Sequence, residues 1–253
     1  MKEVSEHIAG EAARAGLGAN ALVRSFLDSR DFEEALQTAG LTTAKIINLL
    51  LGFLFETNEL ARCRAVRGLG LTVSALARKD LDAAREIMRR LMWSLNDESG
   101  GIGWGAPEAM GEIMAENENL ALEYHRILVS YIDEHGNPLE NDLLERGVMW
   151  GICRLAQKRP RLLLDWTGPI VAQLKSCDPV KRALALKTLL WLAPFEKSHP
   201  QPEALAALLA PLLDDPAEVR TFQDGSFVHL KIGAMAGELL GRLRCPPEPE
   251  TVR

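Results

Sequence analysis

The amino-acid sequence predicts an all-α protein, built as an α–α superhelix of about five to six antiparallel helix pairs. Apolar residues recur with helical spacing along most of the chain, for example at Ala84, Ile87, Met88 and Leu91. We find no convincing run of alternating apolar and polar residues bounded by turn residues, the pattern expected of a strand. Small residues recur at a longer interval, as expected of stacked helix pairs.

The first part of the chain is expected to form a cap. Short helical patterns cover residues 21–27, 31–39 and 43–55, and they depart from the repeat found downstream. We therefore expect residues 1–57 to form an irregular helical cap, which the ends of a helical solenoid need. Residues 58–245 are expected to form one continuous domain of repeats, and the Pro-rich residues 246–253 a disordered tail.

Downstream of the cap, amphipathic helical patterns alternate with turn residues. The predicted helices cover residues 81–95, 120–132, 162–174, 183–192, 204–213 and 228–243. Asp178 followed by Pro179 has the pattern of a helix N-cap with proline in the first turn. The longest connection is expected at residues 215–227, where we expect an irregular insertion.

Small residues give the chain its longer period. Gly70, Gly111 and Gly151 are 41 and 40 residues apart, and a period of this length built of two helices is typical of an α-solenoid. Three segments carry a family resemblance: Arg64-Ala-Val-Arg-Gly-Leu-Gly70, Asp178-Pro-Val-Lys-Arg-Ala183 and Asp215-Pro-Ala-Glu-Val-Arg220. They resemble HEAT repeats, in their bacterial phycobilin-lyase-type variety, over residues 58–243. The resemblance implies an armadillo-type superhelix and says little about function.

Composition and charge argue against several classes of protein. The 253 residues are 47% hydrophobic and 25% charged, which is normal for a soluble globular protein. The formal net charge of −6 argues against a protein that holds nucleic acid by its phosphates. The longest apolar run is too short to span a bilayer, and the polar start lacks a signal-peptide core. The Cys residues lack Cys-x-x-Cys spacing, so we expect a reduced, cytoplasmic protein.

The most unusual segment is residues 93–112, which holds two Trp, four acidic residues and five Gly. Ordering so many glycines costs conformational entropy, so we expect this backbone to lie close to a helix or a ligand. A helix should begin near Pro107, with Glu108 and Glu112 on one face. The loop before it either folds Trp104 back onto the solenoid or contacts a ligand. A nucleotide site is disfavoured, because no Lys-Ser/Thr pair and no preceding strand are present.

A later predicted helix carries a second row at helical spacing, Arg146, Trp150 and Arg154. The two rows could form Glu–Arg pairs between repeats, or a polar pocket walled by Trp104 and Trp150. An acid pair or a hard-cation site is a third alternative. The candidate partner-binding residues are Asn96, Asp97, Glu98, Trp104, Glu108, Glu112, Arg146, Trp150 and Arg154. By contrast, Trp93 and Trp191 are flanked by Leu and are expected in the core.

We assign no catalytic or metal-binding residues and expect no cofactor, because the five His are widely separated. The expected function is non-enzymatic: a recognition or scaffold protein that binds a protein or peptide partner on the concave face of the superhelix. An acidic protein with an aromatic patch suits a partner with basic or apolar groups. We expect no membrane association, and the sequence leaves the oligomeric state open.

The alternative function is enzymatic. HEAT-like DNA glycosylases that remove alkylated bases use Trp and Asp in a concave cleft, where Trp93, Asp97, Trp104 and Trp150 would be the counterparts. The similarity is one of composition only. The negative net charge argues against it, because contacts to the phosphate backbone dominate DNA affinity.

Overall fold

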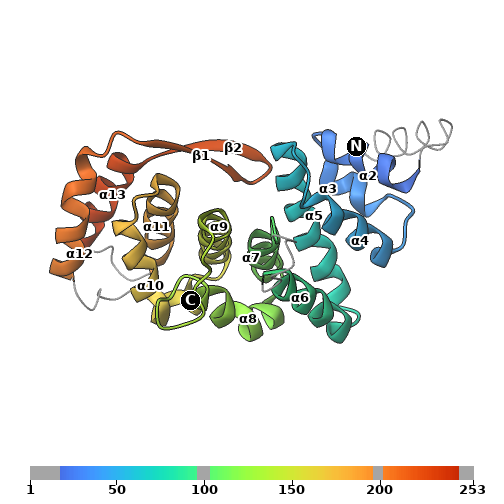
Figure 1. Ribbon diagram of the computed structural model, residues 1–253, viewed down its shortest axis with the longest axis horizontal. Coiled ribbons are helices and arrows are strands. Elements are labelled where there is room, and N and C mark those ends of the chain that lie inside the picture. The colour runs from blue at the N-terminus through green and yellow to red at the C-terminus, as the bar shows by residue number, and fades with distance from the viewer. Residues whose placement is uncertain (1–17, 96–102, 196–201, 245–253) are drawn as a thin grey trace, which may run out of the picture. The chain divides into compact units, whose positions relative to one another are not determined.

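Helices dominate the chain in the computed structural model, which describes residues 18–95, 103–195 and 202–244 (Figure 1). The chain divides into two compact units, Met1–Asn117 and Glu118–Arg253. The predicted all-α class is confirmed, with one small β-hairpin in the second unit. The boundaries of the cap and of the repeat domain stay predictions, and the tail at residues 246–253 lies outside the described residues.

The described part of the first unit contains six helices. They are α2 (Ala19–Asp28), α3 (Phe32–Gln37), α4 (Thr43–Phe53), α5 (Glu59–Ala77), α6 (Leu81–Leu95) and α7 (Ala106–Glu116). The first three agree with the helical patterns predicted for the cap. The side chains of Thr42 and Asn58 cap α4 and α5, since each accepts a hydrogen bond from a backbone N–H of the first turn. Helix α5 is central, because α4, α6 and α7 all pack against it.

Close approach of α5 and α7 explains one of the periodic glycines. A Cβ atom added at Gly70 would lie 2.5 Å from Cγ of Glu112 and 3.2 Å from its carbonyl oxygen. No side chain fits in that space without displacing α7. Leu69 beside it is fully buried, as are Met110 and Ile113 on α7. The small residue at this position therefore lets two apolar helix faces meet.

The second unit contains helices of more varied length. They are α8 (Glu118–Ser130), α9 (Asp142–Lys158), the 3-10 helix η1 (Pro160–Trp166), α10 (Thr167–Ala172), the 3-10 helix η2 (Gln173–Lys175), α11 (Pro179–Leu192), α12 (Pro202–Leu209), the 3-10 helix η3 (Ala210–Asp214) and α13 (Ile232–Arg244). Helix α11 packs against both α9 and α13. Its predicted N-cap is confirmed, because Asp178 accepts a hydrogen bond from the N–H of Val180.

The prediction of one continuous helix over residues 162–174 is wrong. This segment is divided among η1, α10 and η2. Pro169 explains the division, because proline lacks an N–H and its ring clashes with the preceding turn, so it is tolerated only in the first turn of a helix. Helix α10 accordingly begins at Thr167, two residues before Pro169.

The expectation that the chain lacks a sheet is wrong at residues 218–231. Strand β1 (Glu218–Gln223) pairs antiparallel with β2 (Ser226–Lys231). Asp224 and Gly225 join the strands with φ angles of 47° and 88°, as a two-residue turn with the strand twist requires. The segment after Asp215 therefore enters a strand and not a repeat helix, and the helix predicted from residue 228 begins at Ile232. The Asp-Gly pair between β-branched and aromatic residues was the signal for this hairpin.

Candidate functional site

The candidate partner-binding residues fall into two described groups, one in each unit. Asn96, Asp97 and Glu98 lie outside the residues that the structure describes. In the first unit, Trp104 precedes α7, while Glu108 and Glu112 lie on that helix. In the second unit, the row of Arg146, Trp150 and Arg154 lies on α9, as its spacing predicts. Whether the two rows form one surface stays a prediction.

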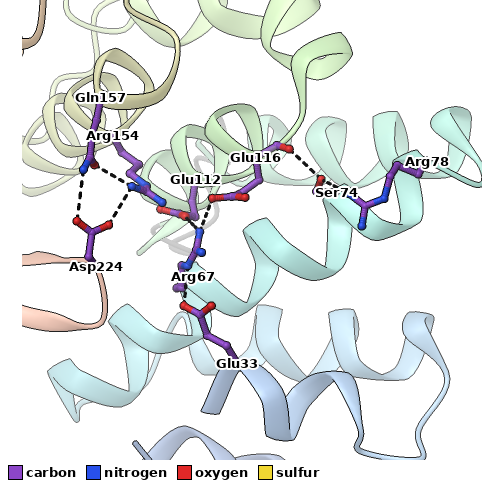
Figure 2. A network of polar contacts seen from close by, with 9 residues as sticks. All are labelled: Glu33, Arg67, Ser74, Arg78, Glu112, Glu116, Arg154, Gln157 and Asp224. Carbon is purple, nitrogen blue, oxygen red and sulfur yellow. Dashed lines mark hydrogen bonds and ion pairs between the residues drawn. The ribbon is translucent and has the colours of Figure 1, made fainter. Parts of the chain in front are cut away.

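The first group includes Arg67, a residue on α5 that the sequence analysis missed. Nη1 of Arg67 donates to Oε1 of Glu112 and Oε1 of Glu116, each at 2.5 Å. Its Nε donates to Oε1 of Glu33 at 2.9 Å (Figure 2). Only 2% of the Glu112 side chain is exposed. An ion pair between Glu112 and an arginine on a neighbouring helix is therefore present, but the arginine comes from α5.

The ionisation of Arg67 depends on these carboxylates. Burial lowers the pKa of Arg67, but the hydrogen bond to Glu33 and the charges and hydrogen bonds of Glu112 and Glu116 raise it by more. The charged form of Arg67 is therefore stabilised. It connects α3, α5 and α7 through charge-assisted hydrogen bonds.

Glu108 has a different environment from Glu112, although both lie on α7. Its Oε2 atom is buried and has no hydrogen-bond partner. Burial raises the pKa of the Glu108 carboxyl to about 7, while a hydrogen bond from its own backbone N–H and the charge of Arg62 act in the opposite direction. Glu108 is thus partly protonated near neutral pH and not a permanent anion. This makes it a weak choice for binding a basic partner.

The described end of the Gly-rich connection is closely packed. A Cβ at Gly103 would lie 2.7 Å from the carbonyl oxygen of Ser94, and one at Gly105 would lie 3.1 Å from Cδ2 of Leu54. Gly105 also has a φ of 73°, in the left-handed region that favours glycine. Trp104 between them is partly exposed. For these residues the contacts agree with the structural alternative, a tight connection against neighbouring helices.

The second group contacts the β-hairpin. The indole Nε1 of Trp150 donates to the carbonyl oxygen of Phe222 at 2.9 Å. Nη1 of Arg154 donates to Oδ1 of Asp224 at 3.2 Å, and Nε2 of Gln157 donates to Oδ2 of the same carboxylate at 3.3 Å (Figure 2). Burial raises the pKa of Asp224, but hydrogen bonds from Gln223 and Gln157 and the charge of Arg154 lower it overall. Side chains of α9 therefore hold an extended backbone and a carboxylate side by side.

Arg146, the remaining member of the row, belongs to a ladder of ion pairs. Its Nε lies 2.5 Å from Oδ2 of Asp178, the residue that caps α11. On α11, Lys181 pairs with Glu145 of α9, and Nη2 of Arg182 lies 2.7 Å from Oδ2 of Asp215. These contacts connect neighbouring helices of the second unit. They agree with the structural alternative of a salt-bridge ladder for this end of the row.

The expectation that Trp93 is a core residue is wrong. Trp93 is 78% exposed, whereas Ala84, Ile87 and Leu91 form the buried face of α6. Trp93 follows Glu86 and Arg89 at helical spacing and so lies on the polar face of the helix. This spacing indicates an exposed position for Trp93. The expectation of burial relied instead on the leucines near it in sequence. Trp191 is partly buried, with Nζ of Lys187 5.8 Å from its ring centroid.

Other chemistry is limited in the described part of the chain. No group of three or more His, Cys, Asp or Glu side chains there could hold a metal ion. Burial raises the pKa of the Cys153 thiol to about 11, against the effects of Thr188, Lys187 and Arg154, so this thiol is protonated at neutral pH. No described helix combines the length and the apolar character that crossing a membrane requires.

The comparisons with known proteins concern mainly the fold. No protein-family model matches the sequence. An uncharacterized protein of Archaeoglobus fulgidus is 32% identical over 108 residues, which are 43% of this chain and 52% of that protein. The chain thus spans about half the length of this curated relative.

Solved structures give a broader match. A designed armadillo repeat protein is 16% identical, with a TM-score of 0.52 over 88% of this chain and 92% of that one. Computationally designed armadillo repeat proteins for modular peptide recognition are 15% identical, with a TM-score of 0.50 over 87% and 91% of the two chains. At such low identity the likeness concerns the fold alone. This chain has an armadillo-like helical-repeat fold.

Proposed function

We propose that this chain is a recognition protein, which binds a protein or peptide partner on the concave side of its helical repeats and catalyses no reaction on it. The observation that carries the proposal is on α9. Trp150 there bonds a backbone carbonyl of a strand, and Arg154 bonds the carboxylate of the adjoining turn. A surface that binds such groups within the chain has the chemistry to bind them in a separate peptide.

The fold supports the same function. Stacked helix pairs present long rows of side chains from successive helices, which suits the recognition of extended partners. The similarity to designed armadillo proteins for modular peptide recognition agrees with this use of the fold. The comparisons give no support to the glycosylase alternative. Our assignments to the phycobilin-lyase-type variety of repeats and to the cytoplasm stay predictions.

A selection from a library of random peptides displayed on phage tests the proposal. We expect the purified chain to enrich peptides that share a motif. Their affinity should fall at least about tenfold in the double variant Trp150→Ala/Arg154→Ala, because truncating a central aromatic or arginine anchor costs 2 kcal/mol or more. Arg161→Ala, which changes an exposed residue of η1, is the matched control.

Two results would contradict the proposal. One is a selection that enriches no motif; a motif that binds the double variant as well as the wild type would contradict only the role of α9. The other is release of alkylated bases from DNA by the purified chain, at a rate proportional to the amount of protein. The second result would favour the enzymatic alternative.

A further inference from the structure

The β-hairpin is anchored differently at its two ends. At the base, Val219 and Leu230 form a buried cross-strand pair, and the strands contact α11 and α13. At the tip, 56% of the Asp224 side chain is exposed. A Cβ added at Gly225 would meet no atom within 4 Å. The turn residues Asp224 and Gly225 are thus held by polar contacts to α9, whereas Phe222 behind them is only 6% exposed.

The contact at Phe222 is one that any extended segment could make. Gln223 and Ser226 flank the two-residue turn, and Phe222 and Phe227 form the next pair. In an antiparallel ladder, the residue after a hydrogen-bonded pair directs its N–H and C=O away from the partner strand. The carbonyl of Phe222 therefore points outward from β1, where Trp150 donates to it. Trp150 contacts a backbone group, so this bond does not depend on the side chain at that position.

The contact at Asp224 adds chemical selectivity. Arg154 and Gln157 bond one carboxylate oxygen each. The guanidinium of Arg154 is a donor of fixed geometry with a permanent charge, so it discriminates strongly between a carboxylate and a cation. The carboxylate belongs to the second residue after the carbonyl that Trp150 binds. Together the three α9 side chains define a short pattern, a strand carbonyl followed two residues later by the carboxylate of a turn residue.

We propose that Trp150, Arg154 and Gln157 form the binding site for an acidic hairpin turn of the partner, and that the chain's own hairpin tip occupies this site until the partner displaces it. This inference rests on the proposed recognition function and names the site and the chemistry of the partner. Phe222 and Phe227 pack edge to face within the hairpin, with ring centroids 5.6 Å apart. Each ring therefore keeps this part of its burial when the tip moves.

Fluorescence titration of a labelled peptide tests the inference. The probe is a synthetic peptide with the sequence of residues 218–231, closed by an added terminal disulfide to hold the hairpin. The receptor is the full chain, either wild type or Asp224→Gly, which removes the internal carboxylate while glycine keeps the turn conformation. A tip that occupies the site nine-tenths of the time weakens the apparent affinity about tenfold, so we expect Asp224→Gly to bind the probe about tenfold or more tighter than the wild type.

Three controls make the result specific. Adding Arg154→Ala to Asp224→Gly should abolish the gain in affinity, and a probe with lysine in place of its aspartate should not bind. Glu218→Gln changes an acid at the hairpin base that pairs within the hairpin and should bind the probe as the wild type does. Circular dichroism and hydrogen exchange of the helical amides establish that each variant folds.

The inference is overturned if wild type and Asp224→Gly bind the probe equally, if Arg154→Ala leaves the gain intact, or if the lysine probe binds as well. Repeating the phage selection on both proteins separates this failure from failure of the recognition function. Peptides that bind both proteins equally, at a site insensitive to Arg154→Ala, would support recognition elsewhere on the chain. An absence of selected peptides for either protein would contradict recognition itself.

Discussion

Replacing Glu108 by glutamine should make folding stability less dependent on pH. The carboxyl of Glu108 lies in the first turn of α7, with Oε2 buried and without a hydrogen-bond partner. Burial raises its pKa from 4.5 to about 7 in the folded chain. Glutamine has nearly the same shape and cannot ionise. The substitution therefore removes the cost of ionising this group with little change in packing.

The sign of the effect follows from proton linkage. Between the unfolded pKa of 4.5 and the folded pKa of about 7, the folded state retains a proton that the unfolded state releases. The free energy of unfolding of the wild type therefore falls as pH rises through this window. Two and a half pKa units correspond to about 3.4 kcal/mol in full, of which about 2.5 kcal/mol is lost between about pH 5 and about pH 8.

Urea unfolding of the full chain, followed by circular dichroism at these two pH values, measures the effect. We expect the difference in unfolding free energy between Glu108→Gln and the wild type to shift by about 2.5 kcal/mol in favour of the variant at the higher pH. The matched control is Glu86→Gln, whose carboxylate is 61% exposed and keeps its hydration when the chain folds. Identical pH dependence for wild type and Glu108→Gln would refute the reasoning, because the carboxyl would then be hydrated in the folded state.

Further substitutions at four positions test the packing of the two units. Gly70→Ala should lower the melting temperature through a loss of about 1–3 kcal/mol, because its Cβ would lie 2.5 Å from Cγ of Glu112. A Cβ added at Gly52 would meet no atom within 4 Å, so Gly52→Ala should instead raise the melting temperature through a gain of about 0.4–1 kcal/mol. A change of melting temperature in the same direction for both variants would contradict the packing account. In urea unfolding, Arg67→Met should cost about 3–5 kcal/mol, since it removes the guanidinium from a nearly buried carboxylate, and a loss below about 1 kcal/mol would count against this. Asp178→Ala should cost about 0.5–2 kcal/mol through loss of the α11 cap, in addition to the loss of the ion pair with Arg146, and Asp178→Asn should recover the capping part only.

Local patterns predicted most of the helices, because an amphipathic helix needs only side chains three or four residues apart. The N-cap at Asp178 was predictable for the same reason. The hairpin at residues 218–231 was missed, since residues 215–227 were expected to form an irregular connection and the apolar residues from 228 onward also suit a helical pattern. There the Asp-Gly turn and cross-strand pairing outweighed the helical pattern.

The candidate site was less predictable, because its contacts join residues far apart in sequence. Arg67 and Glu112 are 45 residues apart, and no local spacing indicates that they pair. Trp150 was selected from its helical row, but its partner is a backbone carbonyl, which carries no sequence signal. The raised pKa of Glu108 also depends on burial by distant residues and not on its neighbours in the chain.

The distance between the hairpin and α9 along the chain has a consequence during protein synthesis. Trp150 precedes Phe222 by 72 residues, and Arg154 precedes Asp224 by 70. At about 5–20 residues per second, translation needs roughly 4–14 seconds to produce the tip after the α9 row has been made. A nascent chain on the ribosome therefore presents that row without its hairpin for seconds, so chaperones and partners first meet it uncovered.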